Sequence, residues 1–187
     1  MTTDIFPSSN AVATPALPYL ISGYATSDGS AEPSRSATAT AASLTLSAMA
    51  STAGLDSTDG VFISGATNKK FAILNVVTVN TSSTIYRPPP GTTESVTVQK
   101  CVRIPVEFEC KAFRWGNLGT LEMWEWFSGM PLNSAIKTTA AGVRTYETEP
   151  GQGGSGSGVG VAVIGGSVYL MPALTPTSSS FIYQALG

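Results

Sequence analysis

The sequence contains no histidine, few charged residues and only two cysteines. Histidine is the commonest general base, the commonest metal ligand and the usual pH switch, so its absence lowers the odds of acid–base or metal chemistry. Cys101 and Cys110 are too few for a disulfide framework or a zinc site. We expect both to be reduced, buried thiols. These absences favour a protein that is not an enzyme and that binds no cofactor.

Charge is scarce: only 12% of the residues are Asp, Glu, Lys or Arg, and the formal net charge is −2. This is about half of the usual share in soluble domains. Serine and threonine together make up about a quarter of the chain instead. A protein that is free in solution normally carries surface charge that opposes association. The composition therefore favours a subunit whose surface is largely covered by neighbouring molecules.

Hydrophobic runs and basic clusters are missing as well. No stretch of eighteen apolar residues occurs, so we expect no membrane span. Met1 is followed by polar residues rather than by a basic and then an apolar region, so no signal peptide is visible. Only Lys69 and Lys70 are adjacent basic residues, whereas a phosphate backbone needs a basic cluster. We expect weak or no direct contact with nucleic acid and synthesis in a cytoplasm.

The first part of the chain is rich in proline. Four prolines between residues 7 and 33 exclude a helix or a central strand. We therefore expect an extended N-terminal arm over residues 1–40. Its apolar residues Leu17, Tyr19, Leu20 and Tyr24 form a patch that is suited to docking on a neighbouring surface.

The remainder, residues 41–187, has the pattern of a single β domain. Residues 71–80 are apolar on both faces, which predicts a buried strand. Residues 96–112 alternate between apolar and polar, and Pro105 in their middle predicts a bend, a bulge or an edge position. Six to eight short strands with Gly- and Pro-rich turns predict an all-β fold, an antiparallel sandwich that is jelly-roll-like.

The largest apolar side chains gather in one segment, residues 120–127, for which aromatic density favours a strand over a short helix. On a strand, Trp124 and Trp126 share one face and Phe127 lies on the other. Such residues serve as core, as an anchor between subunits or as a stacking platform for a sugar or base. Together with the patch in the arm, we select Trp124, Trp126 and Phe127 as candidate subunit contacts.

Three patterns that resemble catalytic or binding motifs carry little weight. Ser134 and Lys137 fit Ser-x-x-Lys, but the companion elements of the serine enzymes are missing. Residues 151–156 fit G-x-G-x-x-G, but Pro150 precedes them and more glycine follows, so a flexible loop is expected. Three pairs of glutamates are best explained as solvated strand faces, although such pairs can perform acid–base work on sugars. We predict no catalytic, cofactor-binding or metal-binding residue.

The Ser-, Thr-, Pro- and Gly-rich, weakly charged chain resembles icosahedral coat proteins and phage particle proteins in the style of its composition. That resemblance implies a structural protein of a virus or phage particle, a capsid or coat subunit that acts by self-assembly. Its partners would be copies of itself and any other particle proteins, and its location the virion, assembled in the host cytoplasm. Two alternatives stay open: a phage tail-tube or capsid-decoration protein, and a carbohydrate-binding or adhesion module.

Overall fold

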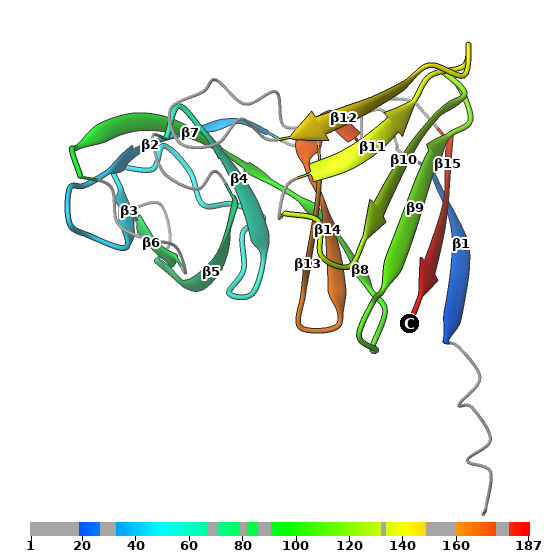
Figure 1. Cartoon of the computed structure of the whole chain (residues 1–187). Helices are drawn as coiled ribbons and strands as arrows, with labels where there is room; N and C mark the ends of the chain where they lie inside the picture. Colours follow the sequence, from blue (N-terminus) through cyan, green and yellow to red (C-terminus); the bar gives the residue numbers. More distant parts are fainter. Residues whose placement is uncertain are drawn as a thin grey trace, which may run out of the picture.

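The computed structural model describes residues 19–26, 33–66, 71–78, 82–85, 91–131, 134–148, 160–174 and 180–187. Within them the chain is all-β, apart from one short 3-10 turn at Pro172–Leu174. The strands form two curled antiparallel sheets, a closed barrel and a larger open sheet (Figure 1). The predicted all-β, antiparallel fold is confirmed, and the two sheets are consistent with a sandwich. The jelly-roll arrangement is not confirmed.

The barrel closes in the order β2-β3-β6-β5-β4-β7. Its strands are β2 (Arg35–Ala39), β3 (Thr45–Ser47), β4 (Gly60–Ser64), β5 (Phe71–Thr78), β6 (Ser82–Ile85) and β7 (Glu94–Lys100). Alternate side chains point inward and form an aliphatic core in which Leu46, Ile63, Leu74 and Val98 are fully buried. Because the sheet closes on itself, every strand of the barrel has a neighbour on both sides.

The open sheet has nine strands in the order β1-β15-β9-β10-β11-β13-β14-β8, and β12 also pairs with β11. Its strands are β1 (Leu20–Thr26), β8 (Val102–Pro105), β9 (Ala112–Asn117), β10 (Glu122–Phe127), β11 (Ser134–Thr138), β12 (Arg144–Thr148), β13 (Val161–Ile164), β14 (Ser167–Leu170) and β15 (Ser180–Leu186). Its core combines aliphatic side chains with large aromatic ones, of which Phe113, Trp115 and Phe181 are almost completely buried.

The barrel lies in the chain between the first and second strands of the open sheet. β1 pairs along its whole length with β15, the last strand, and Leu20 lies opposite Leu186. The six strands of the barrel follow β1 in the chain. The last of them, β7, is separated by Cys101 alone from β8, the next strand of the open sheet. Residues 20–26 and 35–39, both within the expected arm, are thus strands. Residues 1–18 lie outside the described part, and the N-terminal arm is not confirmed.

A third apolar cluster joins the two sheets. Phe62 and Phe71 from the barrel pack with Cys101, Tyr169 and Met171. This explains why the segment from residue 71 is apolar on both faces: one face of its first half points into the barrel and the other against the open sheet. The approach is close at Gly60, where an added Cβ would collide with the Tyr169 ring and lie 2.9 Å from the Phe71 ring.

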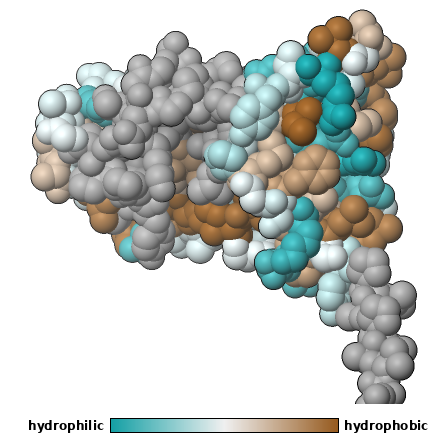
Figure 2. All heavy atoms as spheres, viewed as in Figure 1, coloured by the Kyte–Doolittle hydropathy of each residue, from teal (hydrophilic) through white to brown (hydrophobic). Residues whose placement is uncertain are grey.

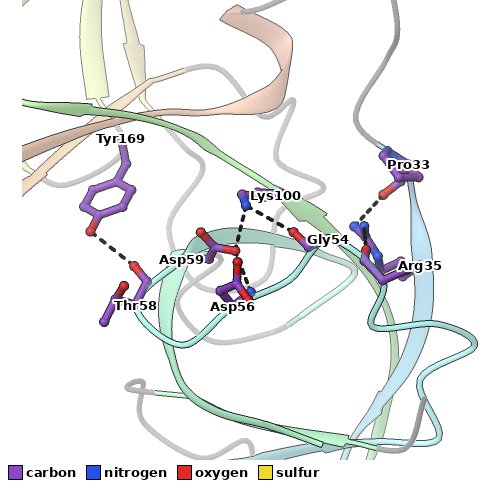
Figure 3. A network of polar contacts seen from close by, with 9 residues as sticks. Pro33, Arg35, Gly54, Asp56, Thr58, Asp59, Lys100 and Tyr169 are labelled. Atoms are coloured by element: carbon purple, nitrogen blue, oxygen red, sulfur yellow. Dashed lines mark hydrogen bonds and ion pairs between the residues drawn. The ribbon is translucent and has the colours of Figure 1, made fainter. Parts of the chain in front are cut away.

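Polar contacts fasten the loop over residues 51–59 beside this junction (Figure 3). Lys100 forms an ion pair with Asp59 at 2.8 Å and donates a hydrogen bond to a loop carbonyl at 3.1 Å. Arg35, which is 5% exposed, donates to a second loop carbonyl at 2.6 Å. The Tyr169 hydroxyl, from the open sheet, donates to a third at 3.5 Å. The loop therefore has contacts to both sheets.

Proline and aromatic content predicted two local features correctly. The alternating segment over residues 96–112 is divided into several elements, and Pro105 ends β8, which lies at an edge of the open sheet. Proline is tolerated there because an edge strand leaves some of its N–H groups unpaired. The aromatic segment is a strand, β10, rather than a helix. The predicted Gly/Ser loop over residues 151–160 lies almost entirely outside the described residues.

Candidate assembly face

The open sheet has one face against the core and one face toward solvent. The strand register places Ile21, Ala185, Phe113 and Trp126 in one row across β1, β15, β9 and β10, and these side chains lie in or against the core. The neighbouring rows point the other way because side chains alternate along a strand. We call the solvent-facing side of β1, β15, β9, β10, β11 and β12 the outer face.

The outer face carries several large apolar side chains in the open. The exposed members are Leu20, Tyr24, Met123, Phe127, Tyr146, Ile182 and Leu186. Tyr24, the most exposed of them, has 62% of its surface accessible. Hydrophobic and hydrophilic residues lie side by side over the open sheet (Figure 2). Several large apolar side chains exposed among polar ones on one face are typical of an interaction site.

A carboxylate held between two guanidinium groups lies among these apolar residues. Glu125 on β10 accepts a hydrogen bond from Arg114 on β9 at 2.8 Å and another from Arg144 on β12, also at 2.8 Å. The Glu125 side chain is 10% exposed, whereas the two arginine side chains are more than half exposed. The Glu125 carboxylate therefore has its hydrogen-bond partners within the chain. Both arginines present their apolar stems and their remaining N–H donors at the surface.

A shallow trough of about 560 Å³ runs along this face between β1 and β10. Its floor is open because Gly116 on β9 has no side chain, and only Ile182 borders the space at 3.1 Å from an added Cβ. Tyr24, Met123 and Arg114 line its walls. The trough is apolar with one charged wall, which suits an apolar side chain from another protein.

The residues selected from the sequence fall into four groups. Leu20, Tyr24 and Phe127 lie together on the outer face, although Phe127 is more than 100 positions from the other two in the chain. Tyr19 is exposed at the end of β1, where its ring stacks on Phe108 with centroids 5.6 Å apart. Leu17 lies outside the described residues. The remaining two, both tryptophans, are not on this face.

Trp124 and Trp126 lie in the core, with 4% and 6% of their surfaces exposed. Neither indole N–H has a hydrogen-bond partner, whereas the Trp115 indole donates to the carbonyl of Leu174 at 3.0 Å. Lys137 lies 5.4 Å from the centre of the Trp124 ring. In this monomer both rings therefore serve as packing rather than as a surface for a partner or a sugar.

Four outer-face residues were not selected from the sequence: Met123, Tyr146, Ile182 and Leu186. Side chains alternate between the two faces of a strand, so the sequence shows which residues of a strand share a face. It does not show which face is exposed to solvent, because that depends on pairing between distant strands, for example of Ile182 with Tyr24. No local pattern in the sequence predicts that pairing.

Ser134 and Lys137, which fit Ser-x-x-Lys, do not form a catalytic arrangement. Ser134 is fully buried and its hydroxyl donates to the carbonyl of Pro131 at 2.6 Å, while Lys137 pairs with Glu122 at 2.7 Å. No group of three or more potential metal ligands exists among the residues that the structure describes. Cys110 is buried, and this burial raises the pKa of its thiol. Both cysteines are reduced and buried, as predicted.

Comparisons with known proteins do not assign this chain to a family. No family model matches it, no curated protein matches it, and no solved structure matches it. In the described part of the chain, no helix is long and apolar enough to cross a membrane. Any proposal about function therefore depends on the geometry of the molecule and on its composition.

Proposed function

We propose that this chain is a structural subunit of a virus or phage particle, a capsid or coat protein, and that it acts by self-assembly through the outer face. The observation that supports this most is the combination on one sheet face of exposed Tyr24, Met123 and Ile182 with the Arg114–Glu125–Arg144 cluster. The proposal requires neither a jelly-roll arrangement nor an extended N-terminal arm.

The composition of the outer face matches that of a protein interface. Aromatic residues, methionine and arginine are enriched at the centre of interfaces, whereas lysine and acids are depleted there. Tyrosine and arginine also dominate the residues that contribute most binding energy. The one acid at the centre, Glu125, is paired with two arginines, so a partner does not have to bury an unpaired carboxylate. The cluster keeps one excess positive charge, which a carboxylate or carbonyl group of the partner can meet.

The proposed partners are copies of the same chain and any other proteins of the particle, and the proposed location is the virion. The scarcity of charge in the whole chain supports association with protein rather than with nucleic acid. A tail-tube or a decoration protein would use the same kind of face with a different symmetry. No observation favours carbohydrate binding, because the two rings suited to it, Trp124 and Trp126, are buried.

The test is the mass and shape of the purified protein. We expect light scattering to show a mass that rises with concentration above the 19.3 kDa of one chain. Negative-stain microscopy of the same samples should show closed shells for a coat protein, and tubes or rings for a tail protein. A protein that stays monomeric at millimolar concentration would overturn the proposal.

A further inference from the structure

Three strands of the open sheet have an edge to which no strand within the described residues is bonded: β1, β8 and β12. Natural proteins usually protect such edges with charges or proline, since an open edge is a template for another chain. β8 contains Arg103 and Pro105, and β12 contains Arg144 and Glu147. β1, with the sequence LISGYAT, contains no charge and no proline. It is thus the edge of the three that lacks this protection.

The backbone hydrogen bonds show which groups of β1 are unused. The carbonyl of Tyr19 accepts from Gly187 at 2.9 Å, so residue 19 and alternate residues after it point toward β15. On the other side of β15, the carbonyl of Leu186 accepts from Lys111, which gives the same alternation. Residues 20, 22, 24 and 26 of β1 therefore direct their N–H and C=O groups away from the sheet.

We propose that β1 pairs antiparallel with β1 of a second copy, so that two nine-stranded sheets join edge to edge. The inference rests on the proposed function, because it names the contact through which copies meet. A strand that pairs with itself needs a register in which outward-pointing residues face each other. A two-fold axis at Gly23 provides it, since Leu20 then lies opposite residue 26 and Ser22 opposite Tyr24.

This register also places the same face of both sheets on the same side. The even-numbered residues Leu20, Ser22 and Tyr24 lie on the outer face, and the two-fold places even residues opposite even residues. The outer faces of the two copies become continuous, and the troughs beside Tyr24 lie on both sides of the axis. A second copy fits better than a foreign peptide for this reason: it extends the apolar face as well as the hydrogen bonding.

The first test is a proline substitution at an outward-pointing residue. Ser22→Pro removes an N–H that no β1–β15 hydrogen bond uses, so the fold is retained. Because each copy contributes one such N–H, we expect the dissociation constant of the β1 dimer to rise about 100-fold. Ser22→Ala is the matched control, since it keeps the N–H and should leave the dissociation constant unchanged. Light scattering and sedimentation measure both variants.

The second test needs no substitution. In quenched hydrogen exchange on the full chain, the amides of Ile21 and Gly23 should be protected at every concentration, because they bond to β15. The amides of Ser22 and Tyr24 should exchange fast in dilute monomer and become protected as the mass rises. Protection of these amides that does not change with concentration would overturn the proposal, because the edge would then be covered by the protein's own chain.

The outcomes separate this inference from the proposed function. If wild type and Ser22→Pro assemble equally well and the amides of Ser22 and Tyr24 stay exposed, β1 pairing is wrong while self-assembly stands. If the wild type never associates, both are wrong. If the wild type assembles, Ser22→Pro forms the β1 dimer about 100-fold more weakly and Ser22→Ala matches the wild type, both are supported.

Discussion

The barrel and the open sheet both consist of antiparallel strands, but they differ in their free strand edges and in the apolar side chains that they expose. The barrel closes, so its strands have no free edge. The open sheet ends in β1 and β8 and presents a wide face to solvent. Of the exposed large apolar residues in the described part of the chain, Val76 lies on a barrel strand, whereas seven lie on the outer face of the sheet. The difference indicates that the barrel completes itself within one chain and that the open sheet is the part suited to a partner.

The two regions also differ in how their cores are filled. The barrel core consists of alanine and aliphatic side chains, while the core of the open sheet contains all three tryptophans of the chain. A small closed barrel has room only for such side chains. The open sheet has to cover a larger area with fewer neighbours, and aromatic side chains bury the most area each. This distribution makes tryptophan fluorescence a probe of the open sheet alone.

The largest expected effect tests whether the two regions unfold together. Leu46→Ala in the barrel core should lower the free energy of unfolding by about 3 kcal/mol, because Leu46 is fully buried. Since Phe62, Phe71 and Tyr169 join the regions, we expect the urea midpoint read by tryptophan fluorescence to fall as far as the midpoint read by circular dichroism. A fluorescence midpoint that does not move would show that the barrel unfolds by itself.

A smaller effect is expected at the junction. Gly60→Ala should cost about 2 kcal/mol of stability, because the new methyl group collides with the buried Tyr169 ring. Gly91→Ala is the matched control: an added Cβ there meets nothing within 4 Å, and the midpoint should stay within about 0.5 kcal/mol. Equal urea midpoints for the two variants would contradict the close packing of the two regions.

The charged cluster of the outer face should contribute about as much. Glu125→Ala removes two charge-assisted hydrogen bonds, and we expect a loss of about 2 kcal/mol in urea unfolding. The comparison variant is Glu109→Ala, whose side chain is 83% exposed and pairs only with Lys111. Exposed pairs of this kind contribute about 0.5 kcal/mol or less. A Glu125→Ala variant as stable as Glu109→Ala would mean that the cluster is loose in solution.

The smallest effect distinguishes the tryptophans of the sheet core. Trp115→Phe loses the hydrogen bond to Leu174, whereas Trp126→Phe removes an N–H that has no partner. Both lose similar volume, so we expect Trp115→Phe to be about 1 kcal/mol less stable than Trp126→Phe in thermal or urea unfolding. The reverse order would show that the Trp126 indole has a partner in solution.

Local patterns in the sequence identified strands, but they did not identify which sheet a strand joins. The alternation over residues 96–112 is continuous in the sequence, yet Val98 points into the barrel and Ile104 into the core of the open sheet. The same period fits both sheets, so nothing in it marks the transition at Cys101. The prolines predict an extended arm over residues 1–40, yet residues 20–26 form β1, whose partner β15 lies about 160 residues away. Pairing at that distance leaves no local signal.

The sequence predicted only some residues of the outer face, because pairing between distant strands decides which side chains are exposed. Leu20 and Tyr24 are predicted as contacts from the apolar patch of the expected arm and Phe127 from the aromatic segment, and all three share the outer face. Trp124 and Trp126 are predicted as contacts as well, but size and hydrophobicity cannot separate a core residue from an exposed one on a strand with two apolar faces. Only the register shows that Phe127 lies outside and Trp126 inside.

The most direct measurement of the central claim compares one charge placed on each region. Met123→Lys puts a charge at the centre of the outer face, and Val76→Lys puts the same charge on an exposed apolar site of the barrel. Mass should be followed by light scattering against concentration for both variants and the wild type. The account predicts that the wild type and Val76→Lys assemble alike and that Met123→Lys forms nothing larger than the β1-paired dimer. Growth of Met123→Lys beyond the dimer at the wild-type concentration would contradict it.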